Sequence, residues 1–230
     1  MGAKQTGGLD RRGTPLAPRA DEVPQHEVCV NGFWMGKHEV TREQWRLVME
    51  SLKPIDVPND RRPAVNVSWE DANGFVRRLN AQAPAGERFR LPTEAEWEFA
   101  CLPGEPKGDI EDAHGPRKVA LLQMAWYREP QRDNPATRNV GELAANPLGL
   151  HDMLGNVWEW TEDIYLPDSY ERHARDNPRV ISGSDRHVMR GGSFKSDITQ
   201  ARCGARAHGV PNDRLPSVGL RVVRVAAKSQ

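Results

Sequence analysis

The stretch 148–163 combines carboxylates, glycine and tryptophan at spacings that suit cation binding. Asp152 and Glu159 lie on either side of a turn at Gly155. Their carboxylates and the main-chain carbonyls of Gly155 and Val157 can surround one point. Oxygen ligands of this kind suit a hard cation such as calcium. The sequence therefore predicts a structural calcium site at Asp152, Gly155, Val157 and Glu159.

The second half of this stretch alternates as a β-strand does. From Val157 onward, alternation sends Trp158 and Trp160 to one face of the strand. Val157 and Glu159 then point to the other face. We expect a core strand whose opposite face carries a charge.

Composition limits the classes of protein that this chain can represent. Its 230 residues suffice for one good-sized domain. The 32 basic and 32 acidic residues leave no net charge to recruit nucleic acid or an anionic membrane. No apolar run approaches the roughly 20 residues of a membrane-spanning helix. We therefore expect a protein, peptide or small-molecule partner, with no nucleic acid and no membrane span.

The elements that must position these residues can be placed coarsely. Thr41 and Thr93 are each followed three residues later by Gln or Glu, which predicts a capping box and a helix start. A further helix opens at Ser68, with apolar residues at the spacing of a buried stripe. Strands are expected at 27–30, 33–35, 157–160, 188–194, 202–207 and 220–224. Because helices come first and strands later, the order favours an α+β fold over alternating βαβ units.

Residues 1–25 differ in polarity from the rest of the chain. Residues 1–25 are polar and are expected to form an N-terminal loop, without the apolar segment of a signal peptide. Residues 26–226 are expected to form a single domain, in which 103–146 is a long excursion. Cys29 lies in an alternating segment, so we expect a small core hydrophobe there rather than a reactive thiol.

Six blocks follow one another across nearly the whole chain. They are Phe33-Trp-Met-Gly-Lys-His-Glu-Val-Thr41, Pro63-Ala-Val-Asn-Val-Ser-Trp-Glu-Asp-Ala72, Arg90-Leu-Pro-Thr-Glu-Ala-Glu-Trp-Glu-Phe-Ala100, Gly149-Leu-His-Asp-Met-Leu-Gly-Asn-Val-Trp-Glu-Trp160, Arg190-Gly-Gly-Ser-Phe194 and Gly219-Leu-Arg-Val222. In this order they resemble the formylglycine-generating enzyme family, also called the sulfatase-modifying factor family. The resemblance implies an irregular, C-type-lectin-like α+β fold with low regular secondary structure, stabilised by calcium. The family's calcium loop maps onto the four positions chosen above on chemical grounds.

The resemblance also implies a departure at the start of the chain. Family members open with a strand that ends in Phe-x-Met-Gly, and here Met1-Gly2 stands where that Met-Gly would be. The expectation is a truncated or lost first strand, and a truncation would also conceal an export signal.

The resemblance does not extend to the copper site. Formylglycine-generating enzymes oxidise a cysteine of a client sulfatase with copper held by two cysteines, which lie just beyond the block at 190–194. Here Ser196 stands at the first cysteine's position and the second position is missing. Because Cu(I) prefers thiolates to a hydroxyl, we predict that this chain does not make formylglycine. Iron is an alternative without support, since the family's non-haem-iron members carry their histidines on an extra N-terminal helical domain.

Cys101 and Cys203 resemble a pair that forms a structural disulfide in some family members. Two independent buried thiols are the alternative. A bridge would imply an oxidising compartment, either periplasmic or extracellular, whereas separate thiols would fit a cytoplasmic protein.

A candidate pocket is expected where the loop 202–214 meets the long excursion. Arg206, His208 and Asp213 are weak catalytic candidates, offering charge-assisted hydrogen bonds and one group that titrates near neutrality. The alternative is that Arg206 ties down the loop and His208 faces solvent. Further candidates for lining the pocket are Trp126, Tyr127, Ser196, Arg202 and Asn212, with the two aromatic residues favoured as packing residues.

Three functions are compatible with these features. The first is a non-catalytic module that uses the lectin-like scaffold to bind a partner or ligand. The second is a diverged oxidative-maturation enzyme acting on a peptide or peptide-derived metabolite, as in the family branch that matures pyoverdine without the copper cysteines. The third is a retroelement-diversified binding protein, since such proteins share the fold.

Overall fold

A computed structural model describes residues 1–2, 19–50, 60–106, 116–128 and 136–226. Its helices are η1 (Ala20–Glu22), α1 (Arg42–Met49), α2 (Trp69–Asn80), α3 (Glu94–Cys101), η3 (Leu102–Gly104), α4 (Pro116–Met124), α5 (Ser169–Arg172) and η4 (Ile198–Gln200). Its strands are β1 (Trp34–Met35), β2 (Glu87–Arg90), β3 (Ala125–Trp126), β4 (Leu154–Gly155), β5 (Trp158–Ile164), β6 (His187–Arg190), β7 (Arg206–Gly209), β8 (Val218–Leu220) and β9 (Val223–Ala226). Short elements and long connections give the irregular α+β fold that the sequence predicts.

The three predicted helix starts are confirmed, and each of them has a capping box. Thr41, Ser68 and Thr93 each accept a hydrogen bond from the backbone N–H three residues on, and the side chain there bonds back to the cap. Both free donors are thereby satisfied without any distant contact. Local chemistry therefore fixes where α1, α2 and α3 begin.

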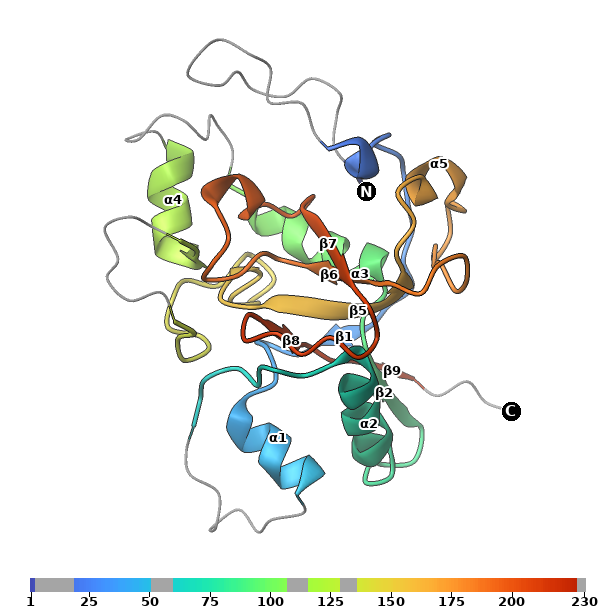
Figure 1. Ribbon diagram of the computed structural model, residues 1–230, viewed down its shortest axis with the longest axis vertical. Coiled ribbons are helices and arrows are strands. Elements are labelled where there is room, and N and C mark those ends of the chain that lie inside the picture. Colours follow the sequence, from blue (N-terminus) through green and yellow to red (C-terminus); the bar gives the residue numbers. More distant parts are fainter. Residues whose placement is uncertain (3–18, 51–59, 107–115, 129–135, 227–230) are drawn as a thin grey trace.

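The strands form three small sheets around β5. The largest has the order β7-β6-β5-β8, in which β8 runs parallel to β5 and the other neighbours are antiparallel. A second sheet has the order β1-β9-β2, and β3 pairs in parallel with β4. In Figure 1, α1 and α2 lie at one end of the molecule, below β5, while α4 and α5 lie at the other end. β5 therefore lies between the helical ends.

The predicted strand at 157–160 is present as β5, and both of its faces are buried. Trp158 and Trp160 belong to one apolar cluster with residues of α2 and β8, including Val218. Trp160 also donates its indole N–H to the Val67 carbonyl at 2.9 Å. Glu159 lies on the other face and is fully buried. The charge predicted for that face is thus an interior charge.

Several strand boundaries differ from the prediction for identifiable reasons. β6 ends at Arg190, because Gly191 and Gly192 have φ values of 100° and 80° that turn the chain. The predicted strand 220–224 is instead two strands, β8 and β9, separated at Arg221 and Val222. Between them, Arg221 points inward and donates to the buried Glu159 carboxylate.

The predicted strand at 27–30 and the predicted burial of Cys29 are wrong. The backbone of Cys29 forms an isolated β-bridge with Asp176, and its thiol is exposed. The alternation is present, but Val28 and Val30 are the residues that pack against the cluster of Met1, Ala95 and Tyr170, so Cys29 takes the outward position. Within the described residues, no helix combines the length and apolar character needed to cross a membrane.

Candidate functional site

Glu159 is fully buried and accepts hydrogen bonds from two side chains. Arg221 donates to both carboxylate oxygens, through Nε at 3.1 and 3.0 Å and through Nη2 at 2.8 Å. The Trp97 indole N–H donates to Oε2 at 2.7 Å. Arg221 also donates to the Gly36 and His151 carbonyls, each at 2.9 Å. One buried ion pair thus joins β5 to three other segments.

Asp152 and Glu39 lie near this ion pair, and each has at least one carboxylate oxygen without a hydrogen-bond partner. Asp152 accepts a hydrogen bond from Gly141 N–H at 2.7 Å through Oδ2, while Oδ1 is buried without a partner. Glu39 is fully buried and neither of its carboxylate oxygens has a partner. Burial, followed by the charge of Asp152, holds the pKa of Glu39 well above its usual range. Burial likewise raises the pKa of Asp152.

The four positions expected to hold calcium fit a cation only in part. Asp152 has a free oxygen to offer, but the Glu159 oxygens already accept the hydrogen bonds of Arg221 and Trp97. A guanidinium bound to a carboxylate in this way competes with a metal ion for the same lone pairs. Among the described residues, no three side chains of His, Cys, Asp or Glu converge in a metal-binding arrangement. Glu159 therefore does not fit as a ligand in this geometry.

Asn156 connects three segments that are distant in sequence. Its N–H donates to the Trp126 carbonyl at 2.7 Å, and its carbonyl accepts from Phe194 N–H at 2.9 Å. Its side chain accepts from Arg138 N–H at 3.0 Å and donates back to the Arg138 carbonyl. Asn156 has a φ of 54°, which asparagine tolerates better than most residues. A single buried amide thus places Trp126, Arg138 and Phe194 together.

Ser196 lies beside this junction and is committed to structure. Its hydroxyl accepts from Ser193 N–H at 3.0 Å, and its carbonyl accepts from Arg128 N–H at 2.9 Å. Cys101 and Cys203 are bonded to each other and Cys29 is on the surface, so the described residues bring no thiolate to Ser196. This oxygen donor does not fit Cu(I), which prefers sulfur ligands.

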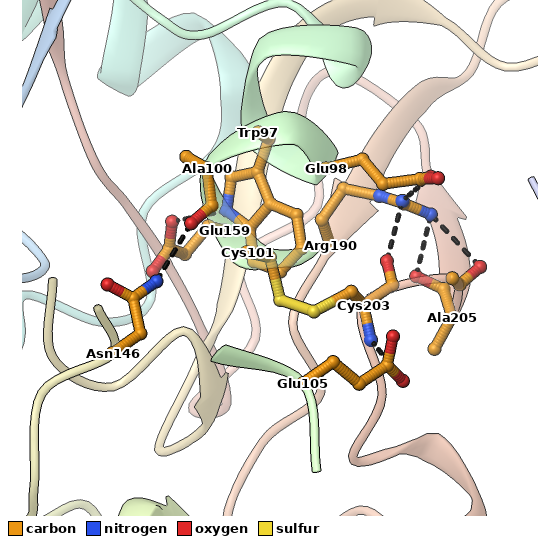
Figure 2. Close-up of a disulfide and its surroundings, with 11 residues drawn as sticks. Trp97, Glu98, Ala100, Cys101, Glu105, Asn146, Glu159, Arg190, Cys203 and Ala205 are labelled. Atoms are coloured by element: carbon orange, nitrogen blue, oxygen red, sulfur yellow. Dashed lines mark hydrogen bonds and ion pairs between the residues drawn. A yellow bond between two sulfur atoms is a disulfide. The ribbon is translucent and has the colours of Figure 1, made fainter. Parts of the chain in front are cut away.

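Cys101 and Cys203 form a disulfide across a sequence separation of 102 residues, as the family resemblance implies. Figure 2 shows it between the end of α3 and the segment before β7, with Trp97 and Arg190 on one side. Arg190 donates to the carbonyls of Cys203, Gly204 and Ala205 and is ion-paired with Glu98. Both the bridge and the guanidinium therefore fix the same segment to α3.

Arg206, one of the catalytic candidates, is buried and held in an ion pair. It is 1% exposed and forms a two-pronged ion pair with Glu94, at 2.7 and 3.0 Å. Tyr165 and Tyr170 lie against the guanidinium, with its carbon 5.0 and 4.5 Å from their ring centres. Although burial opposes it, the charges of Arg206 and Arg190 hold the pKa of Glu94 below its usual value. These contacts agree with the alternative interpretation, in which Arg206 anchors the loop.

Asp163 lies behind Glu94 and is also buried. It accepts from the N–H groups of Glu94 at 2.8 Å and Val180 at 2.9 Å. Burial, and then the charge of Glu94, raises the pKa of Asp163 to about 7.

The other pocket candidates separate into groups. Arg202 pairs with Glu22 of η1 at 2.6 Å, and His208 stacks on Tyr165 with ring centres 4.0 Å apart. Asp213 accepts from Val210 N–H at 2.9 Å, which closes its own turn beside exposed Asn212. Trp126 and Ser196 lie at the Asn156 junction instead, and Tyr127 is a buried core residue. The described contacts thus do not gather the expected set into one pocket.

The sequence prediction missed Glu39, Arg221 and Asn156, although all three lie in the blocks that carry the family resemblance. A charged residue directly before Val40 and another within an apolar run at 218–223 were available signals. Such residues in core-like surroundings indicate buried partners. The partners themselves come from distant segments and leave no local pattern.

The comparisons with known proteins agree with this architecture. Residues 3–226 match the family described as "Sulfatase-modifying factor enzyme 1-like domain". The Chlamydia caviae protein named serine/threonine-protein kinase pkn1 is 30% identical over 247 residues, which cover 95% of this chain and 37% of that protein. The mouse formylglycine-generating enzyme is 31% identical over 169 residues, covering 69% of this chain and 43% of the enzyme. The chain thus spans less than half the length of these relatives.

A solved structure shows the same fold. PvdO from Pseudomonas aeruginosa superposes with a TM-score of 0.80 at 22% sequence identity, covering 97% of this chain and 89% of PvdO. This likeness concerns the fold, which is C-type-lectin-like. Together with the family match over residues 3–226, it leads to one conclusion: the chain belongs to the sulfatase-modifying factor, or formylglycine-generating enzyme, family.

Proposed function

We propose that this domain is a binding module. It binds an acidic peptide or another anionic ligand at the surface formed by the segments that Asn156 connects. This surface consists of Trp126, Arg128, Arg138 and Lys195. The observation that carries the proposal is that buried Asn156 brings these cationic and aromatic segments together around a serine. In the matching position, the family's copper enzymes have a thiolate.

The charge and shape of this surface favour an anionic ligand. Lys195 and Arg128 are exposed, and the Arg138 guanidinium carbon lies 5.3 Å from the Trp126 ring centre. Asp197 is the acidic group paired with Arg128, at 3.5 Å. This surface thus carries three cationic side chains, and Arg128 is the one that pairs with Asp197. Guanidinium groups beside an aromatic ring bind carboxylates through charge-assisted hydrogen bonds.

The test compares two triple variants that remove the same charge. The first carries Arg128→Gln, Arg138→Gln and Lys195→Gln. The control carries substitutions of exposed arginines elsewhere, namely Arg172→Gln, Arg175→Gln and Arg186→Gln. Fluorescence polarisation with labelled acidic and basic peptides of equal length should show a preference for acidic peptides. That preference should fall at least tenfold in the first variant and persist in the control. Equal loss in both variants would reduce the effect to net charge and overturn the proposal.

An oxidative-maturation enzyme is the second candidate function. It is favoured by the 31% identity to formylglycine-generating enzymes over 69% of the chain. Oxygen uptake by protein supplied with copper or iron and a cysteine-containing peptide would support it, and Ser196→Ala should leave such uptake unchanged if the serine has only a structural role. The retroelement-diversified alternative stays a prediction, which requires a template repeat and a reverse transcriptase beside the coding region.

A further inference from the structure

We propose that a cleft between α1 and the segment 64–67 binds a small carboxylate with an apolar or aromatic body, such as an arylalkanoate. The cleft has a volume of about 350 Å³, which lies within the range of roughly 300–1,000 Å³ typical of small-molecule sites. Its residues are different from those of the surface around Asn156. The proposal therefore goes beyond the function proposed above and does not depend on it.

One face of α1 provides the first wall of the cleft. The residues that line it from this helix and its C-cap are Arg42, Trp45, Arg46 and Glu50. Their spacing of three and four residues places them on the same side of a helix. The capping box at Thr41 fixes where the helix begins, and with it the orientation of this face. Local chemistry thus presents these side chains together.

The opposite wall is held in place by backbone hydrogen bonds. The Ala64 N–H donates to the Val40 carbonyl at 2.8 Å, and the Asn66 N–H donates to the Leu215 carbonyl at 3.0 Å. Asn66 has a φ of 58°, so the chain turns there. Ala64 and Val67 are buried and contribute apolar surface, whereas Asn66 is exposed and offers a side-chain amide. This wall therefore combines apolar contacts with one polar group.

The indole of Trp45 gives the cleft a fixed aromatic surface. Its ring stacks on Phe75 of α2, with ring centres 5.4 Å apart and an angle of 6° between the planes. Trp45 also packs against the largest apolar cluster while it stays only partly buried. Because the ring is already immobilised, a ligand that contacts it costs little further side-chain entropy. This surface suits an apolar or aromatic body.

The two guanidinium groups of the cleft have free hydrogen-bond donors. Arg62 donates to both carboxylate oxygens of Asp60 at 2.9 Å, whereas Arg42 lies 3.6 Å from the same carboxylate. Among the described residues, Arg46 forms no ion pair, and neither Arg42 nor Arg46 donates a side-chain hydrogen bond. Guanidinium groups bind carboxylates through paired, charge-assisted hydrogen bonds. These two arginines can therefore hold the carboxylate of a ligand.

The charges that line the cleft favour a monoanion. Arg42 and Arg46 carry two positive charges and Glu50 carries one negative charge, so a single carboxylate balances the remaining charge. Glu50 is exposed at the C-terminal end of α1, where it repels a second negative charge on a ligand. A dianion such as phosphate suits this lining less well than a carboxylate on an apolar body.

The test titrates isotope-labelled protein with phenylpropionate, indoleacetate and benzoate while NMR spectra follow the indole N–H signal of Trp45. The variant Trp45→Phe identifies that signal. We expect a saturable shift with these carboxylates. Phenylpropanol keeps the ring without the charge, and acetate keeps the charge without the ring. Each of these two should bind roughly tenfold more weakly than phenylpropionate.

Two variants test the roles of the charged residues. Arg46→Gln should weaken phenylpropionate binding roughly tenfold, because it removes a charge-assisted contact. Glu50→Gln should strengthen binding by about twofold to fivefold, because it removes an exposed like charge. The matched control is Arg77→Gln, which removes an exposed arginine of α2 that does not line the cleft. This control should bind as the wild type does, and so should the triple variant of the surface around Asn156, so the two proposals can fail separately.

Several results would overturn the proposal. They are the lack of a saturable shift with all three carboxylates, equal weakening by Arg46→Gln and Arg77→Gln, and equal affinity for phenylpropanol and phenylpropionate. Tighter binding of inorganic phosphate than of phenylpropionate would overturn the choice of a monoanion. Cooperative unfolding in urea checks that each variant is folded, and Arg42→Gln replaces Arg46→Gln if the latter fails this check.

Discussion

Reduction of the Cys101–Cys203 bridge should remove a large share of the stability of this domain. The bridge closes a loop across a separation of 102 residues, and both sulfurs are buried. In the chain-entropy treatment, a loop of about 100 residues stabilises the folded state by roughly 4.7 kcal/mol, because it restricts the unfolded chain. Natural domains have about 5–15 kcal/mol in total. The expected loss on reduction is therefore roughly 3–5 kcal/mol.

The assay is urea unfolding followed by tryptophan fluorescence, with and without reductant. Trp97 and Trp160 are fully buried and report on the core. The denaturant slope should also increase on reduction, since the open chain exposes more surface when it unfolds. Cys101→Ala with Cys203→Ala should lose somewhat more than reduction does, because buried sulfur contacts disappear as well.

Cys29→Ala is the control, since this thiol is exposed and unbridged. It should change the free energy of unfolding by no more than about 0.5 kcal/mol. Oxidised and reduced proteins that unfold within about 1 kcal/mol of each other would refute the entropic reasoning. The expectation of an oxidising compartment stays a prediction, and it gains weight only if the loss is large.

Three further outcomes follow from single contacts. Gly155→Ala should lower the free energy of unfolding in urea by about 2–5 kcal/mol, because φ is +92° and a Cβ would lie 2.1 Å from the Trp126 carbonyl oxygen. The control Gly149→Ala has a φ of +77° and open space, so it should lower the free energy of unfolding by only about 1–2 kcal/mol. Equal losses in the two variants would rule out the clash. Ser196→Ala should cost about 1–3 kcal/mol by leaving the buried Ser193 N–H unpaired, and an unchanged urea midpoint would contradict this. Because the folded pKa of Asp163 is about 7 and the usual value is 3.8, the folded state binds more protons between these values. Stability from this group should therefore fall as pH rises from about 4 to about 7, by up to about 1.4 kcal/mol per pH unit; Asp163→Asn should lose that dependence, and parallel pH curves for both proteins would show the reasoning to be wrong.

Local sequence patterns were enough to predict where the helices begin, but they did not predict which residues pair in the candidate site. Thr41, Ser68 and Thr93 specify helix starts through bonds three residues long, so the sequence alone sufficed. Glu159 was correctly placed on a strand face opposite the tryptophans. Its partner Arg221 is 62 positions away, however, and no periodicity reports such a pairing.

The same distinction explains the fate of the pocket candidates. Arg206 and His208 are residue types found in catalytic sites. The sequence does not reveal that Arg206 forms an ion pair with Glu94, which lies 112 positions away. The tertiary ion pair with Glu94 favours the structural interpretation of Arg206. Family resemblance supplied the fold because six blocks together carry long-range information that one motif lacks.

The order of strands in the sheet β1-β9-β2 constrains how the chain can fold during synthesis. β9 pairs with both β1 and β2, so residues 223–226 lie between strands made much earlier. Until that segment leaves the ribosome, Trp34–Met35 and Glu87–Arg90 have no central strand to pair with. Unpaired edges of this kind can pair with other chains. We expect nascent chains that end before residue 223 to depend on chaperones, and release of the last strand to complete the domain.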